Sequence, residues 1–362
     1  MKVRLEDVCD RGSSNLKQSD IVDTSGNYPI YGASGYISNV DFYHQDKPYV
    51  AVVKDGAGIG RTTLHPAQSS VIGTMQYLIP KENILPEYLY YVVRYMHLEK
   101  YFTGATIPHI YFKDYKNEQF NLDSLEKQKE IIDILGNCER VITKREEELQ
   151  KLDKLIKARF VELFGDPLNN TKGWMEQRLG ECCVINPKKT TDSRLEEDLE
   201  ISFIPMASVS ECGEILKLED KFYREVKNGF TYFCEGDVLF AKITPCMENG
   251  KGAVAVGLTN GIGFGSTEFH VLRPIKEKSN SYWLYALTSF ELFRKKAEKN
   301  MTGSAGQKRV PASFLENIKI SVPPISLQDE FEKLLIEVNK SKVVSQHTTS
   351  NPYIQNLNFA VK

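Results

Sequence analysis

The chain has 362 residues, of which 41% are hydrophobic and 26% are charged, and its formal net charge is −2. This length predicts two domains with a sizeable core, and the composition is that of a soluble globular protein. The near-neutral charge excludes an overall positive field, so any binding of nucleic acid requires a local basic surface or a basic partner.

Neither a membrane span nor a disulfide framework is expected. No apolar run is long enough to cross a bilayer, and residues 1–7 lack the apolar core of a signal peptide. The seven cysteines are scattered without a CxxC pair, which indicates reduced thiols rather than disulfides or a zinc site. We therefore expect a cytoplasmic protein that does not associate with membranes.

The first segment, up to about Asn121, mixes short β-rich runs with glycine-rich turns. The predicted elements are strands at 49–53 and 75–79, a helix at 86–101, a turn-rich loop at 103–110 and a strand at 118–122.

Residues 124–164 combine a high density of charge with apolar residues at heptad spacing. The apolar positions, interrupted only by Arg145, are Ile131, Leu135, Cys138, Ile142, Leu149, Leu152 and Ile156. This pattern predicts a helix of about 60 Å that serves as a spacer or as one arm of a coiled coil. An ordinary long surface helix is the alternative. Gly136 inside it costs roughly 1 kcal/mol relative to alanine.

Beyond Pro167 a second unit repeats the features of the first in the same order. Strand-like runs at 237–241 and 267–272 correspond to those at 49–53 and 75–79, and Asn317 corresponds to Asn117. Four residues at the start of the long helix also recur: Leu125, Gln128, Ile131 and Leu135 reappear as Ile325, Gln328, Phe331 and Leu335. Agreement in serial order across both halves indicates an internal duplication.

The second copy of the long helix keeps the apolar pattern only to about Val338. Lys342 stands where Ile142 stood, and Pro352 would break a helix in any case. We expect a shortened helix at 324–345 and an irregular tail at 346–362. The far half of the first helix, from Leu149 to Phe164, should then lack an intramolecular mate and be covered by another subunit, a second copy of the chain or the tail.

A glycine-rich loop follows the strand at 49–53. It lacks the Gly-Lys-Ser/Thr ending of a nucleotide-binding P-loop. Its glycines would allow the backbone to approach a phosphate or a base edge. A hairpin with two solvated cations is the alternative. The candidate contacts in this half of the chain are Lys54, Arg61, Thr62 and His109.

The second unit carries two comparable loops, at 242–252 and 303–311. In the major groove glutamine can pair with adenine, and arginine or lysine with guanine. A flexible basic turn is the alternative for the second loop. The candidate contacts in this half are Lys242, Thr244, Asn249, Lys251, Gln307, Lys308 and Arg309.

No catalytic constellation is present in the sequence. The six histidines show no metal-ligand spacing, and no serine or cysteine lies in a nucleophile motif. Asn351-Pro352-Tyr353 matches part of the Asn-Pro-Pro-Tyr motif of adenine methyltransferases but lacks the second proline. We expect no catalytic residue, no metal and no cofactor in this chain.

The duplicated unit, the helix ending at 162–167, the loop at 242–252 and the segment at 322–328 together resemble the specificity subunit of a type I restriction-modification system. The resemblance implies a mixed α/β fold with two target-recognition domains joined by long helices that pair as an antiparallel coiled coil. The expected boundaries are 1–122 for the first domain, 123–166 for the central helix, 167–323 for the second domain, 324–345 for the second helix and 346–362 for the tail.

The same resemblance implies that each domain reads one half of a bipartite sequence in double-stranded DNA. Methyltransferase subunits, which carry S-adenosylmethionine and the chemistry, would dock on the helices, and restriction subunits could join them. The expected helix-pairing and partner contacts are Ile131, Leu135, Ile142, Leu149, Leu152, Ile156, Phe331, Leu335 and Val338. The alternatives are a coiled-coil interaction scaffold that binds no DNA, and an enzyme.

Overall fold

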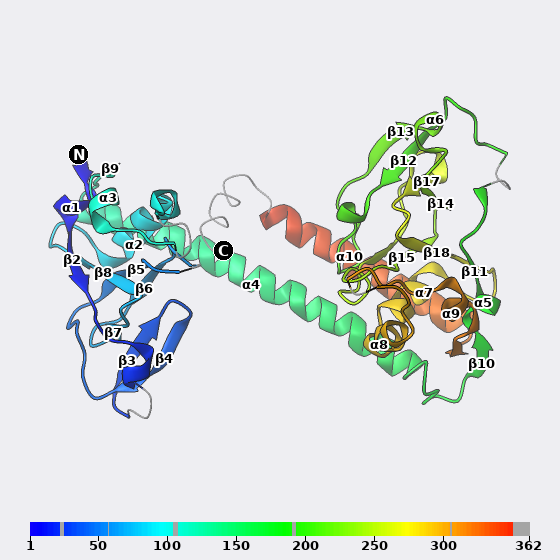
Figure 1. The fold of residues 1–362 in the computed structure, drawn as a ribbon, viewed down its shortest axis with the longest axis horizontal. Coiled ribbons are helices and arrows are strands. Elements are labelled where there is room, and N and C mark those ends of the chain that lie inside the picture. Colours follow the sequence, from blue (N-terminus) through cyan, green and yellow to red (C-terminus); the bar gives the residue numbers. More distant parts are fainter. Residues whose placement is uncertain (22–24, 57, 104–107, 190–192, 305, 350–362) are drawn as a thin grey trace. The chain divides into compact units, whose positions relative to one another are not determined.

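The computed structural model describes residues 1–21, 25–56, 58–103, 108–189, 193–304 and 306–349 (Figure 1). Within it the chain forms two compact units, to which we refer as unit 1 (Met1–Glu146) and unit 2 (Glu147–Gln346). The motif at 351–353 and the end of the predicted tail lie outside the described residues. The domain boundaries drawn from the sequence stay a prediction.

Unit 1 consists of short strands, most of them consecutive, and short helices before the long helix α4. Its strands are β1 (Lys2–Arg4), β2 (Cys9–Ser13), β3 (Tyr28–Gly32), β4 (Gly35–Val40), β5 (Tyr49–Val53), β6 (Thr62–His65), β7 (Ser70–Val71), β8 (Met75–Pro80) and β9 (Gln119–Asn121). Its helices are α1 (Leu5–Val8), α2 (Pro86–Tyr95), α3 (Phe112–Tyr115) and the first part of α4 (Leu125–Phe164), with 3-10 turns η1 (Gln18–Ile21) and η2 (Leu98–Tyr101).

Unit 2 follows the second part of α4 with a similar set of short strands and helices. Its strands are β10 (Met175–Arg178), β11 (Cys183–Ile185), β12 (Glu200–Ile204), β13 (Glu219–Phe222), β14 (Thr231–Cys234), β15 (Val238–Ala241), β16 (Gly252–Val254), β17 (Ile262–Gly265), β18 (Phe269–Pro274) and β19 (Lys319–Val322). Its helices are α5 (Leu179–Cys182), α6 (Tyr223–Val226), α7 (Ser281–Ser289), α8 (Glu291–Lys299), α9 (Ala312–Asn317) and α10 (Ile325–Thr349), with 3-10 turns η4 (Met206–Ser208) and η5 (Thr259–Gly261).

The predicted strands and the long helix are confirmed, and one predicted helix is shorter than expected. The helix expected at 86–101 ends as α2 at Tyr95, and η2 resumes at Leu98. His97 between them has a φ of 51°, which is incompatible with a continuing right-handed helix. The left-handed conformation of His97 therefore divides the predicted helix into α2 and η2.

The two units contain the same four-stranded antiparallel sheet. The strand order is β2-β8-β5-β6 in unit 1 and β11-β18-β15-β16 in unit 2. The interior strand β5 or β15 is buried along its whole length, in agreement with its unbroken apolar sequence. A two-stranded ribbon, β1-β9 or β10-β19, precedes the long helix of each unit. The duplication inferred from the sequence is thus present in the topology.

Each unit also has a second sheet, and these differ in size. Unit 1 has three strands in the order β4-β3-β7, and unit 2 has four in the order β13-β12-β17-β14. Each contains one parallel pair, β3 with β7 and β12 with β17, although nearly all the other pairs are antiparallel. The duplicated part of the fold is therefore the first sheet and its helices.

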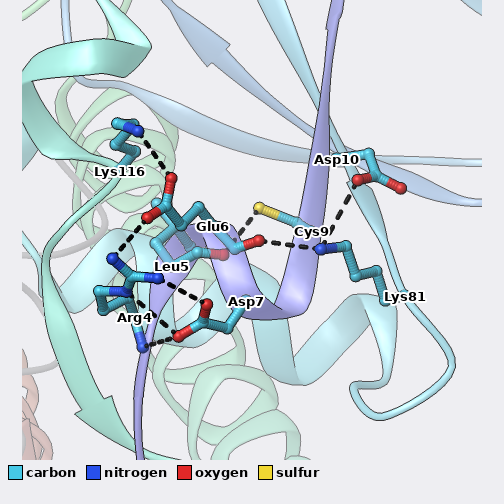
Figure 2. A network of polar contacts seen from close by, with 8 residues as sticks. All are labelled: Arg4, Leu5, Glu6, Asp7, Cys9, Asp10, Lys81 and Lys116. Carbon is cyan, nitrogen blue, oxygen red and sulfur yellow. Dashed lines mark hydrogen bonds and ion pairs between the residues drawn. The ribbon is translucent and has the colours of Figure 1, made fainter.

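A network of charges holds the first helical turn of unit 1 (Figure 2). The guanidinium of Arg4 lies 2.8 Å from the carboxylate of Glu6 and 3.2 Å from that of Asp7. Lys116 donates to Glu6 at 2.8 Å, and Lys81 donates to the Glu6 carbonyl at 2.9 Å. The hydrogen bond from Lys116, aided by Arg4, lowers the pKa of Glu6. These contacts tie α1 to the segments that follow β8 and α3.

The turn at α1 is repeated as α5, which the sequence reasoning missed. Residues 4–9 read RLEDVC and residues 178–183 read RLGECC. In both turns the cysteine thiol donates to the leucine carbonyl at 3.4 Å, from Cys9 to Leu5 and from Cys183 to Leu179. Comparing the two halves from their first residues would have revealed this match.

A buried glutamine anchors the start of each long helix to its unit. In unit 1 the Gln128 amide donates to the carbonyls of Asn83 and Asp123 and accepts from the Leu85 N–H, at 3.0, 2.9 and 2.9 Å. The glutamine side chain is fully buried, and these three bonds give both amide N–H groups and the amide oxygen a partner.

Gln328 makes the same three bonds in unit 2. Its amide donates to the carbonyls of Lys278 and Pro323 and accepts from the Asn280 N–H, all at 3.0 Å. It is also fully buried. The recurrence of glutamine noted in the sequence therefore has a structural cause.

In unit 2, α10 packs antiparallel against the second part of α4. The Phe331 ring lies 5.7 Å from the ring of Phe160 and 5.3 Å from that of Phe164, measured between centroids. Farther along, Lys342 lies 2.5 Å from Asp153. Residue numbers rise along one helix as they fall along the other, which defines the antiparallel direction.

The expectation that Leu149–Phe164 lacks an intramolecular mate was wrong. An antiparallel helix that starts at Ile325 lies beside the C-terminal end of its partner, so the retained seam of α10 covers the far half of α4. Lys342, which replaces the seam residue Ile142, is buried and forms an ion pair rather than ending the packing. Helix α10 also extends to Thr349, beyond the predicted limit of 345.

Candidate nucleic-acid interface

The candidate loops of each unit meet at the end of its central strand. We call each meeting point a loop frame. Frame 1 consists of Lys54–Gly56, directly after β5, and Pro108–Ile110. Frame 2 consists of Lys242–Thr244, directly after β15, and Lys308–Val310. The structure therefore brings together loops that are separated in each half of the sequence.

Three backbone hydrogen bonds define frame 1. The Lys54 N–H donates to the Thr74 carbonyl at 3.0 Å, and the Ile110 N–H donates to the Lys54 carbonyl at 2.9 Å. The Gly56 N–H donates to the Pro108 carbonyl at 3.0 Å. Because both the N–H and the carbonyl of Lys54 are hydrogen-bonded, the backbone position from which its side chain extends is fixed.

The same three bonds define frame 2. The Lys242 N–H donates to the Glu268 carbonyl and the Val310 N–H donates to the Lys242 carbonyl, both at 2.9 Å. The Thr244 N–H donates to the Lys308 carbonyl at 3.0 Å. The backbone of the candidate site is thus built twice, while the side chains upon it differ except for the shared lysine.

Frame 1 is an ion-paired cluster centred on Asp55. Its carboxylate lies 2.5 Å from the Lys54 ammonium and 2.7 Å from Nδ1 of His109. Burial raises the pKa of Asp55, but the hydrogen bonds from Lys54 and His109 outweigh that effect and lower it. Two predicted contact residues, Lys54 and His109, therefore converge on one carboxylate that the sequence reasoning did not single out.

In frame 2 the paired carboxylate belongs to Glu268, which lies outside the two segments of the frame. Arg309 donates to both carboxylate oxygens of Glu268, with Nε at 2.9 Å and Nη2 at 2.8 Å. This bidentate pair lowers the pKa of Glu268. Lys242 is half-buried, and its pKa is lowered first by burial and also by Arg309, against the opposing effect of Glu268. Among the described residues, none accepts a hydrogen bond from the Lys242 ammonium.

The remaining candidates of unit 1 have different environments. Arg61 is exposed and donates to the Ala33 carbonyl at 3.0 Å, which links its loop to the turn between β3 and β4. Thr62 is buried, and its hydroxyl donates to the Gly60 carbonyl at 3.1 Å. The Thr62 hydroxyl thus stabilises the loop from inside, and its contact with DNA stays a prediction.

The remaining candidates of unit 2 divide in the same way. Thr244 donates to the Glu248 carboxylate, and Lys251 reaches the Met206 carbonyl at 3.5 Å. Their polar groups therefore support the loop. Asn249, Gln307 and Lys308 are exposed, and they retain the side-chain donors and acceptors that base edges require.

Two exposed aromatic side chains lie close to the candidate residues of unit 1, and the sequence reasoning did not predict them. Tyr111 is 48% exposed and stacks on His109, with ring centroids 6.4 Å apart. Tyr36, near the turn that Arg61 contacts, is 61% exposed. The position of Asp55 beside Lys54 was visible in the sequence, whereas the pairing of Glu268 with Arg309 was not.

The predicted helix-pairing residues all lie on the less exposed side of their helices. Ile131 packs on the core of unit 1, and Ile156 packs on that of unit 2. Phe331, Leu335 and Val338 are buried. The others, Leu135, Ile142, Leu149 and Leu152, are buried or half-buried. Contact of these residues with another subunit stays a prediction.

In the described part of the chain, no three histidine, cysteine, aspartate or glutamate side chains are placed to hold a metal ion. No helix within it is both long enough and apolar enough to cross a membrane.

A family model described as "Type I restriction modification DNA specificity domain" matches residues 1–154 and 171–344. The specificity subunit of the Escherichia coli type I restriction enzyme EcoAI is 43% identical over 164 residues, which are 45% of this chain and 27% of that relative. The matched segment thus spans about a quarter of that protein. The MjaVIII specificity subunit of Methanocaldococcus jannaschii is 24% identical over 349 residues, 86% of this chain and 80% of the relative.

Two solved structures resemble this fold over nearly its full length. The S subunit of a type I restriction-modification system from M. genitalium has a TM-score of 0.61 at 13% identity, covering 99% of this chain and 94% of that one. A chain from a study of complex assembly and conformational transition in the type I R-M system has a TM-score of 0.53 at 16% identity, covering 99% and 95%. At these identities the likeness concerns the fold.

Proposed function

The chain belongs to the type I restriction modification DNA specificity family, and we propose that it is the non-catalytic subunit that selects the DNA sequence for a type I restriction-modification complex. The observation that carries this proposal is the loop frame, which is built twice from the same three backbone hydrogen bonds but carries different side chains. A duplicated scaffold with divergent loops suits the reading of two different half-sites.

Each frame would read one half of a bipartite target in double-stranded DNA. The exposed side chains of frame 2 and its surroundings, Asn249, Gln307 and Lys308, would contact base edges or phosphates there. In unit 1 the corresponding surface would be formed by Arg61, His109 and the exposed tyrosines. Two half-sites read from one face of B-DNA lie about 34 Å apart or a multiple of it, so a long helix is a suitable spacer.

The chemistry would come from partner subunits in the cytoplasm. Methyltransferase subunits would dock on the long helices and supply S-adenosylmethionine, and restriction subunits could join them. On α4, Ile134 and Val141 are 60% and 51% exposed and lie seven positions apart, which places them on one face of the helix. An exposed apolar stripe of this kind is suited to a partner helix.

The decisive experiment is to combine the chain with its methyltransferase subunits and map methylated adenines in a mixed-sequence DNA by single-molecule sequencing. We expect one bipartite motif whose methylation depends on this chain. Methylation that is independent of the chain would contradict the proposal. The absence of any footprint on duplex DNA, with methyltransferase subunits present, would favour the interaction scaffold.

Variants of the loops provide the residue-level test. Gln307→Ala in unit 2 should relax the preference at one half of the motif, and Arg61→Ala in unit 1 should relax or weaken the other. Loss of both preferences in either variant, with an intact fold, would contradict the assignment of one half-site to each unit.

A further inference from the structure

In frame 2 the described residues offer the Lys242 ammonium no hydrogen-bond acceptor. Two cations, Lys242 and Arg309, lie near the carboxylate of Glu268, and Arg309 occupies both of its oxygens. The other carboxylate at this frame, that of Glu248, accepts a hydrogen bond from Thr244. His270 lies beside them, but burial lowers the pKa of its imidazole, so it adds no charge at neutral pH. The ammonium of Lys242 is therefore a half-buried cation without an acceptor among the described residues.

Frame 1 contains the equivalent lysine in a neutralised form. Asp55 stands where Ile243 stands in frame 2, and its carboxylate lies 2.5 Å from the Lys54 ammonium. His109, at the position of Arg309, donates from Nδ1 to the same carboxylate at 2.7 Å. The Lys54 ammonium and the Asp55 carboxylate therefore neutralise each other in frame 1.

On the basis of the proposed function, we propose that Lys242 contacts a phosphate of the DNA backbone irrespective of sequence. Asp55 prevents Lys54 from making the equivalent contact because it forms an ion pair with it. Lysine is the side chain that the two frames share on their common backbone. Phosphate is the part of DNA that does not change with sequence, so a shared residue suits it. The residues at the neighbouring positions differ between the frames, and these residues would contact the bases.

Burial favours this assignment in frame 2. A half-buried ammonium has lost part of its hydration, and an arriving phosphate restores the interactions that water no longer supplies. In frame 1 a phosphate would instead approach the Asp55 carboxylate, which repels it. The two frames should therefore differ in how strongly salt weakens their contact with DNA.

The size of the effect follows from counterion release. Each phosphate contact on B-DNA contributes a slope of about −0.9 to the logarithm of affinity against the logarithm of salt concentration. Removing one contact should therefore cost about 3.5 times more affinity at 50 mM salt than at 200 mM salt. This ratio is the measured quantity, and it does not require the absolute affinity of either half-site.

The test uses the chain assembled with its methyltransferase subunits and two duplexes, one that contains the methylated motif and one that lacks it. Fluorescence anisotropy between about 50 and 200 mM salt gives the slope for each. Lys242→Gln should weaken binding to both duplexes by the same factor and make the slope shallower by about 0.9. Lys217→Gln, which removes an exposed lysine paired with Glu219, is the matched charge control and should leave the slope unchanged.

Frame 1 supplies the converse variant. Asp55→Asn should release Lys54, steepen the slope by about 0.9 and strengthen binding to both duplexes. Adding Lys54→Gln to Asp55→Asn should abolish that gain. Intrinsic tryptophan fluorescence, which arises from Trp174 and Trp283 in unit 2, checks that Lys242→Gln remains folded.

The outcomes separate this inference from the function on which it rests. If the assembled wild-type complex binds neither duplex, the proposed function is overturned. The phosphate contact is overturned, and the proposed function is not, if wild type binds both duplexes but Lys242→Gln keeps the wild-type salt slope. The same holds if Lys242→Gln loses affinity only for the duplex that contains the motif. A slope change of equal size in Lys217→Gln would also overturn it, because the effect would then be diffuse charge.

Discussion

Replacing Gln328 by methionine isolates the contribution of the buried amide that anchors α10. Methionine keeps the length and approximate volume of glutamine but can neither donate to the carbonyls of Lys278 and Pro323 nor accept from the Asn280 N–H. Three buried hydrogen bonds are lost at about 1 kcal/mol each, so unit 2 should lose about 3 kcal/mol of unfolding free energy.

Urea unfolding followed by tryptophan fluorescence measures this loss in unit 2 alone. Both tryptophans of the chain, Trp174 and Trp283, belong to that unit, and Trp283 is fully buried in its core. The matched control is Gln128→Met, which breaks the same three bonds in unit 1. It should leave the tryptophan transition in place while lowering the unit 1 transition seen by circular dichroism.

Two results would refute the reasoning about the anchors. A loss below about 1 kcal/mol in Gln328→Met would mean that water or rearrangement satisfies the exposed backbone groups. An equal shift of the tryptophan transition in Gln128→Met would mean that the two anchors do not act on separate units.

Two further predictions concern unit 1. Gly136→Ala should stabilise α4 by about 1 kcal/mol in thermal unfolding, since the added Cβ would meet only the Tyr91 hydroxyl at 3.9 Å; destabilisation would contradict the regular helix there. Burial lowers the pKa of His65 from 6.5 to about 4, so the unfolded chain binds the proton first as pH falls. Stability should be full above pH 6.5 and fall by about 3 kcal/mol on approaching pH 4, and His65→Gln should lack this decline in urea unfolding.

The sequence contained most of the information about architecture because architecture depends on periodicity and repetition. The heptad spacing from Ile131 to Ile156 predicted α4, and the serial matches between the halves predicted a duplication, which is present in the first sheet of each unit. The recurrence of Gln128 as Gln328 marked a buried anchor, although the role of the residue was visible only once its three bonds were known.

The register of the helices could not be obtained by comparing the copies. Alignment places Lys342 opposite Ile142 and suggests a lost seam, whereas antiparallel packing places Lys342 against Asp153. The same limit applies within the interface. Lys54 and Asp55 are neighbours in sequence, but Glu268 and Arg309 are brought together only by the end of β18 and a distant loop.

The sequence by itself therefore determined the family, the duplication, the long helix and the loops that carry the candidate contacts. Tertiary structure alone decided which of the basic residues are neutralised, which remain without an acceptor and which half of α4 is covered by α10. The physical reason is that periodicity and propensity act between near neighbours, whereas charge pairing and helix register depend on distances between segments far apart in the chain.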